Sequence, residues 1–296
     1  MENNKKIQVH IINAFVDENK GGNPAGVVLN ADLLTNLQKQ YVAQQVGISE
    51  IAFVSSSTIA DFKLDFFTPI RQIAHCGHAT IGAFSYMVQS GLIQKKNSSK
   101  ETIDGTRSIL LKEDLAFMQQ KPPLYHQINE HSEDILNALG LNHDDLMPHT
   151  DLSIVNTGNS FALIPVINQD ILKKIKPYYQ KIHLISEKFD LVGFYVFSTN
   201  EAYAGIDATT RMFAPRYGIN EEAGTGMAAG PLASYLYDLL GIQKQSFTIQ
   251  QGAFMNPSSP SKIFVDLTIE EGKITNIMAG GKGLYIKTIE ADIPQV

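Results

Sequence analysis

The feature that most constrains the fold is a pattern that occurs twice in the chain. FTPIRQI at 67–73 precedes a glycine at 77, and FAPRYGI at 213–219 precedes a glycine at 224. The phenylalanines lie 146 residues apart and the glycines 147, about half of the 296 residues. A segment rich in small residues follows each glycine, and strands that end at Asn13 and Asn156 precede each pattern. The matching order and nearly constant offset predict a duplicated, two-domain architecture.

Hydrophobic periodicity predicts an α+β chain with many short strands. Helical spacing indicates helices over 35–47, 77–88, 132–140, 168–179 and 226–241. The segments 49–57 and 61–69, the second of which alternates polar and apolar residues, are typical of strands that pair with each other. The proline-bearing segment QKPPLYHQ predicts a boundary, giving an N-terminal domain over 1–122 and a C-terminal domain over 123–283. We expect the last strand, about 284–296, to return to the first domain.

Composition excludes several classes of function. The chain is 44% hydrophobic with a net charge of −6, so it can bury a core and offers no basic surface for nucleic acid or anionic membrane. A single cysteine, Cys76, rules out an internal disulfide and fits a reducing compartment. The N-terminus lacks the apolar core of a signal peptide, and no apolar run is long enough to span a bilayer. We therefore expect a cytoplasmic protein.

The repeated glycines also suggest where a ligand binds. Gly77, Gly224 and Gly226 lie at the starts of the two small-residue helices, where the backbone can approach a ligand without a Cβ in the way. A helix start offers N–H groups and the positive end of the helix dipole, which favour an anion. If the two domains face each other, both starts can bind one substrate carboxylate in a shared cleft.

Four segments carry a resemblance to a known family. GGNPAGVV, GISEIAFV, FFTPIRQIAHCGHAT and EEAGTGMAAG resemble the signature segments of the phenazine-biosynthesis PhzF-like proteins, which share a fold with diaminopimelate epimerase. The resemblance covers nearly the whole chain. It implies two pseudo-symmetric domains, each a mixed β-barrel-like sheet wrapped around a central helix, with the active site between them. It also implies a homodimer and isomerisation of a dihydro-hydroxyanthranilate by proton transfer, without a metal or organic cofactor.

The resemblance assigns the general acid/base to Glu50 and a substrate contact to His78. From the residues alone, Glu50 is better explained as a solvated loop carboxylate, and His78 is also explained as a histidine that caps or packs at a helix end. A carboxyl in a closed apolar cleft has a raised pKa, which would let Glu50 give and take a proton near neutrality.

The second repeat departs from the family pattern. Glu222 stands where the family has aspartate, Ala223 replaces proline, and Met227 replaces a serine after the second glycine. We keep Glu222, with the Thr225 that lies between the two glycines, as a substrate-binding candidate, although an acidic pair at a helix start is also explained by the dipole. Asn23 is a further candidate that is equally explained as a turn residue.

Cys76 admits two interpretations. Cofactor-independent racemases of this fold use two cysteines, one at each helix start, but the second position here is Ala223. Two-thiol epimerisation is therefore excluded, which leaves Cys76 as a buried, inert residue or an accessory acid beside the substrate. His143 and His149 flank an acidic loop that suits solvent better than zinc, and GGKG at 280–283 lacks the context of a phosphate loop. No metal site is expected.

The sequence therefore favours a cofactor-independent isomerase of a small carboxylate-bearing substrate, cyclic or aromatic and amino-acid-like. Two alternatives stay open: a single-base racemase or epimerase that uses Glu50 with His78, and a non-catalytic binding or adaptor protein that keeps the fold.

Overall fold

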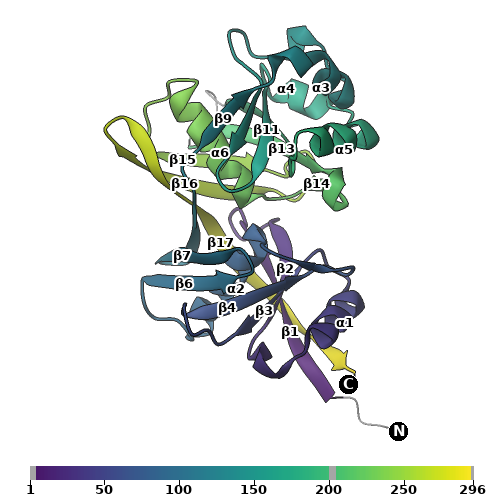
Figure 1. The fold of residues 1–296 in the computed structure, drawn as a ribbon, viewed down its shortest axis with the longest axis vertical. Coiled ribbons are helices and arrows are strands. Elements are labelled where there is room, and N and C mark those ends of the chain that lie inside the picture. The colour runs from purple at the N-terminus through teal and green to yellow at the C-terminus, as the bar shows by residue number, and fades with distance from the viewer. Residues whose placement is uncertain (1–4, 200–204, 295–296) are drawn as a thin grey trace. The chain divides into compact units, whose positions relative to one another are not determined.

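The computed structural model describes residues 5–199 and 205–294, and the chain divides into two compact α+β units (Figure 1). Unit 1 consists of Met1–Gln119 and Gly280–Val296, and unit 2 of Gln120–Ala279. The chain passes between them twice, within β8 (Leu115–Gln120) and β17 (Lys273–Ile293). The α+β class is as predicted.

The strands of unit 1 form a closed barrel. In order around it they are β1 (Lys5–Ala14), β2 (Asn23–Val28), β3 (Ile51–Ser55), β4 (Phe62–Phe67), β6 (Asn97–Thr102), β7 (Gly105–Lys112), β8 and β17. The C-terminal half of β17 closes the ring by pairing antiparallel with β1, the yellow and purple ribbons of Figure 1. The short β5 (Gln72–Ile73) pairs with the end of β4.

A helix fills this barrel. α2 (Gly77–Gln89) buries ten of its 13 residues and contacts β1, β2 and β3. A helix that is apolar nearly all round is stable only when neighbours cover every face. Outside the barrel, the 3-10 turn η1 (Ala31–Leu33) leads to α1 (Asn36–Val46), whose Lys39 reaches the buried carboxylate of Asp65 on β4 at 2.6 Å.

Unit 2 has a comparable sheet with more helices. Its strands are β9 (Leu124–Gln127), β10 (Ser153–Asn156), β11 (Ser160–Pro165), β12 (Gly193–Thr199), β13 (Ala208–Ala214), β14 (Ile219–Glu222), β15 (Ser246–Gln251) and β16 (Ser261–Glu270). Its helices are η2 (Asn129–His131), α3 (Ser132–Leu139), η3 (His143–Asp145), α4 (Gln169–Lys174), α5 (Tyr179–Lys188), η4 (Pro215–Tyr217) and α6 (Gly226–Asp238). α6 is buried as α2 is, and contacts β10, β11 and β16.

The pairing patterns of the two units repeat each other. β2 pairs parallel with β3, β3 antiparallel with β4, and β4 parallel with β6. β11, β12, β13 and β15 pair in the same order and senses. The predicted duplication, with one buried helix for each sheet, is confirmed.

The helix predicted over 35–47 is confirmed at both ends, where the sequence carries capping residues. Thr35 caps α1 in a reciprocal pair with Gln38, and Gly47 ends the helix in the left-handed conformation. The helix predicted over 168–179 is wrong beyond residue 174, because Pro177 disfavours a helical conformation in the residue before it and removes an N–H donor. A second helix, α5, follows.

Among the described residues, no helix combines the length and the apolarity needed to cross a membrane. The cytoplasmic location and the homodimer expected from the sequence stay predictions.

Candidate active site

Glu50 is held at the entrance to strand β3 in unit 1. Its backbone carbonyl accepts a hydrogen bond from the Gly26 N–H of the parallel strand β2 at 2.9 Å. A Cβ at Gly26 would lie 2.9 Å from the side chain of Ile51, so only glycine allows this close approach. Asn23 begins β2, buried, beside the segment that carries Glu50.

Cys76 and His78 enter the same place from the start of α2. Cys76 is the N-cap residue of α2, in an extended conformation, and its side chain makes no capping hydrogen bond. His78 is the second helical residue. The Thr80 hydroxyl donates to the Cys76 carbonyl at 2.6 Å, which fixes the turn on which both side chains stand.

The side chains of Glu50 and His78 form a buried pair. Glu50 Oε2 lies 3.1 Å from His78 Nε2, and the two side chains are 8% and 4% exposed. His78 Nδ1 lies 3.6 Å from the Cys76 Sγ. If Nε2–H of His78 faces the carboxylate, Nδ1 accepts a hydrogen bond from the Cys76 thiol. The imidazole then connects the carboxylate and the thiol in one hydrogen-bonded chain.

The expectation of a raised pKa at Glu50 is wrong. Burial does raise it, but the charge of His78 and hydrogen bonds from His78 and Ser49 outweigh burial and lower the pKa below its ordinary value. Glu50 is therefore a carboxylate at neutral pH, ready to accept a proton. Apolar surroundings alone favour a raised pKa of Glu50, but the distance from Glu50 to His78 is set by the fold.

Cys76 behaves in the opposite way. Burial raises the pKa of its thiol, and the neighbouring Glu50 carboxylate raises it further, while His78 and the Ala79 N–H partly compensate. The thiol is protonated at neutral pH and does not act as a base. A buried, protonated thiol fits both an inert residue and an accessory acid, so both interpretations of Cys76 stay predictions.

A buried lysine lies behind this turn. Lys100 on β6 is fully buried, and its Nζ donates to the Thr80 hydroxyl at 2.6 Å and lies 3.2 Å from His75 Nδ1. Burial holds the pKa of both Lys100 and His75 well below their ordinary values. Lys100 thus reaches the α2 start through Thr80, a link that the sequence did not reveal.

The predicted residues of the second repeat gather in unit 2. The Thr225 hydroxyl donates to the carboxylate of Glu222, and Thr225 is the N-cap residue of α6. Gly224 precedes Thr225, and Gly226 is the first helical residue. Gln251 ties this loop: its Oε1 accepts the Thr225 N–H at 3.1 Å, and its Nε2 donates to the Glu222 carbonyl at 2.8 Å.

Glu221, beside Glu222, has a structural partner. The guanidinium of Arg211 binds both carboxylate oxygens of Glu221 at 2.8 Å. Its remaining nitrogen donates to the Leu172 and Ile175 carbonyls. The two glutamates therefore differ: Glu221 fixes β14 to β13, whereas Glu222 lies at the start of α6.

The predicted residues thus lie in two clusters, one in each unit, which we call the unit 1 and unit 2 half-sites after the sequence prediction. The unit 1 half-site contains Glu50, Cys76, Gly77 and His78, with Asn23 on the neighbouring strand. The unit 2 half-site contains Glu222, Gly224, Thr225 and Gly226. Sequence reasoning missed Gln251, Lys100 and Thr80, since a glutamine or a lysine in a strand gives no sign of burial.

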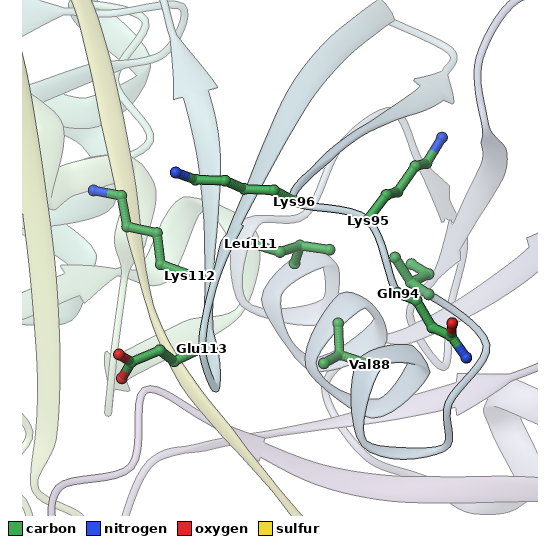
Figure 2. A pocket seen from close by; sticks show the side chains of 8 residues that line it. Val88, Gln94, Lys95, Lys96, Leu111, Lys112 and Glu113 are labelled. Carbon is green, nitrogen blue, oxygen red and sulfur yellow. The ribbon is translucent and has the colours of Figure 1, made fainter.

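A hollow of about 530 Å³ lies at the other end of α2 and is separate from the unit 1 half-site. Val88 and Leu111 line it, and Figure 2 shows Lys95, Lys96 and Lys112 extending away from them. Lys95 is already paired with Asp61 at 2.5 Å. None of the predicted site residues lines this hollow.

Comparison with known proteins gives a consistent result. The family model described as phenazine biosynthesis-like protein (PhzC-PhzF) matches residues 12–288. A protein of Clostridium acetobutylicum named an uncharacterized isomerase is 34% identical over 240 residues, which cover 78% of this chain and 80% of that protein. The uncharacterized isomerase YddE of Escherichia coli is 32% identical over 242 residues, 78% of this chain and 79% of its own length.

A solved structure shares the fold along the whole chain. The crystal structure of the Bacillus anthracis phenazine biosynthesis protein of the PhzF family superposes with a TM-score of 0.87 at 27% identity. The match covers 98% of this chain and 100% of that one.

Proposed function

Because this chain belongs to the phenazine biosynthesis-like (PhzC-PhzF) family, we propose that it is an isomerase that needs no cofactor and acts on a small carboxylate-bearing substrate. The observation that carries the proposal is the buried contact of 3.1 Å between Glu50 Oε2 and His78 Nε2. Relatives named isomerases support the reaction class.

In the proposed reaction Glu50 is the base and then the acid. Its carboxylate accepts a proton from a C–H bond of the substrate, and the electron pair of that bond enters a new double bond. As the new double bond forms, an existing double bond of the substrate breaks and its π pair moves to a second carbon. Protonated Glu50 delivers a proton to that carbon, so the substrate is isomerised with no net gain or loss of atoms. The lowered pKa of Glu50 suits the first step, since the group must begin ionised.

His78 has two roles in this proposal. Its Nε2–H stabilises the Glu50 carboxylate before the reaction and can turn to a polar group of the substrate once Glu50 is protonated. In the proposed mechanism the proton on Glu50 exchanges with solvent before it is delivered, so the product can gain a proton of solvent origin.

The start of α2 supports the choice of a carboxylate-bearing substrate. α2 has 13 residues, so its aligned peptide dipoles place a partial positive charge at Gly77 and His78. That charge favours an anionic substrate group beside the acid/base pair. We propose a cyclic or aromatic, amino-acid-like carboxylate. The participation of Glu222 and Thr225 in the same substrate site stays a prediction.

The test begins with a thermal-shift screen of cyclic and aromatic amino-acid carboxylates, followed by turnover assays on the compounds that bind. Glu50→Gln should lower kcat by roughly 10²- to 10⁴-fold. The matched control is Glu101→Gln. It alters a part-buried glutamate of the same unit that accepts a hydrogen bond from the Ser57 hydroxyl. Equal loss in both variants, or no loss in Glu50→Gln, would remove Glu50 from the mechanism.

The position of the returned proton separates the two enzyme hypotheses. Return to the same carbon on its other face gives an epimer, and return to a different carbon gives an isomer. Product chirality and the site of label distinguish these outcomes.

A further inference from the structure

The donor atoms of the unit 1 half-site are also those that bind a soft divalent metal. Glu50, Cys76 and His78 each offer one ligand atom, and these atoms lie within 4.8 Å of one another. The three residues are 6%, 4% and 4% exposed. We propose that this triad binds Zn²⁺ as a three-ligand site and that the bound metal shuts off proton transfer.

The geometry requires only a small adjustment. Zinc bonds of about 2.3 Å to sulfur and about 2.1 Å to nitrogen or oxygen place tetrahedral ligand atoms roughly 3.4–3.6 Å apart. The separation of 3.6 Å between Cys76 Sγ and His78 Nδ1 already matches the sulfur–nitrogen edge. The carboxylate of Glu50 faces the other ring nitrogen at 3.1 Å, so its side chain must turn toward Nδ1 to complete the site.

Charge favours the bound state. A zinc ion with one thiolate, one carboxylate and a neutral imidazole has no net charge, so the buried site gains no unpaired charge. The thiol of Cys76 loses its proton to solvent when the metal binds, so binding weakens as the pH falls. The hydrogen bond from the Thr80 hydroxyl to the Cys76 carbonyl holds the turn that carries two of the three ligands.

Three protein ligands leave the fourth tetrahedral position open, as in catalytic rather than structural zinc sites. The metal would occupy Glu50 and His78 together, so neither could move a proton. Inhibition rests on the proposed function, but metal binding does not and is measured without any substrate.

The single cysteine makes the test specific. Co²⁺ is titrated into the whole protein, and its thiolate-to-metal charge-transfer absorption is followed in the near ultraviolet. Since Cys76 is the only thiol, this band can arise from no other residue. We expect one Co²⁺ per chain, displacement by one equivalent of Zn²⁺, and complete loss of the band in Cys76→Ser.

Two further variants complete the test. Glu50→Gln should retain the band but weaken Co²⁺ binding by more than about 10-fold, since even the loss of a residue that only supports a metal ligand costs about that much. The matched control His183→Ala removes an exposed imidazole that lies 3.5 Å from a Glu187 oxygen, and should leave the titration unchanged.

If Cys76→Ser does not fold, the rise in melting temperature with Zn²⁺ is compared between wild type and His78→Asn, which should lose it. Absence of the band in wild type at millimolar Co²⁺ would overturn the proposal. So would unchanged affinity in Glu50→Gln, or a band that His183→Ala abolishes.

Discussion

The bidentate pair of Arg211 and Glu221 gives the sharpest test of how unit 2 is held together. The two side chains are 8% and 12% exposed, and the guanidinium also donates to two backbone carbonyls at 2.9 and 3.3 Å. Arg211→Met leaves a carboxylate and two carbonyls without partners in a largely buried site. Removing one partner of a buried pair costs about 3–5 kcal/mol of unfolding free energy.

The loss of stability in Arg211→Lys should be smaller than that in Arg211→Met. An ammonium can retain one contact with Glu221 but cannot reproduce the fork or reach both carbonyls, so we expect a loss of roughly 2–3 kcal/mol. The matched control is Arg216→Met. Arg216 contacts Asp190 at 2.8 Å, but the Asp190 side chain is 90% exposed, and such pairs contribute at most about 1 kcal/mol.

The assay is urea unfolding followed by circular dichroism, because the chain has no tryptophan. Hydrogen exchange of peptides from β13 and β14 assigns the change to unit 2, since the two units need not unfold together. Adding Glu221→Gln completes a double-mutant cycle, and coupling above about 1.5 kcal/mol is expected. Equal, small losses in Arg211→Met and Arg216→Met would refute the reasoning.

Three further predictions concern packing and pH. Gly230→Ala places a Cβ 2.1 Å from the amide oxygen of Gln120, which must move and give up its two buried hydrogen bonds. The free energy of unfolding should fall by about 2–4 kcal/mol. Its counterpart Gly82→Ala meets atoms only at 3.6 Å and should gain up to about 1 kcal/mol; urea unfolding measures both. The pKa of Asp145 is lowered because hydrogen bonds from Asn142 and Lys174 outweigh burial, so its stabilising effect is present above about pH 4 and lost as the pH falls below that. Asp145→Asn should therefore be less stable than wild type at pH 7, with a difference that shrinks toward pH 2 in thermal melts. Burial lowers the pKa of Lys100, so below pH 10.5 the unfolded chain binds one more proton than the folded chain, and the wild type becomes more stable as the pH rises toward that value. The melting temperature of Lys100→Met minus that of wild type should therefore be larger at pH 7 than at pH 10.

Sequence alone predicted the architecture because the fold repeats. The two FxP segments, each followed by a glycine and a small-residue helix, identified the central helices α2 and α6 and the strands beside them. Capping residues such as Thr35 and Gly47 determined one helix to its ends, since these signals act within a few residues of the chain.

The sequence could not supply what depends on distances between segments. Glu50 and His78 were identified separately, but only the fold brings them to 3.1 Å and reverses the expected direction of the Glu50 pKa shift. Lys100 resembles a surface lysine in the sequence and is fully buried in the structure. The convergence of Cys76 with Glu50 and His78 was missed for the same reason.

The central claim is that Glu50 moves a proton between two positions of the substrate. The most direct measurement is turnover in D₂O, with deuterium located in the product by NMR. The account predicts deuterium at the carbon that gains a proton, at a rate that falls with turnover in Glu50→Gln and is retained in Glu101→Gln. Deuterium that enters the product equally fast without the Glu50 carboxylate would contradict it.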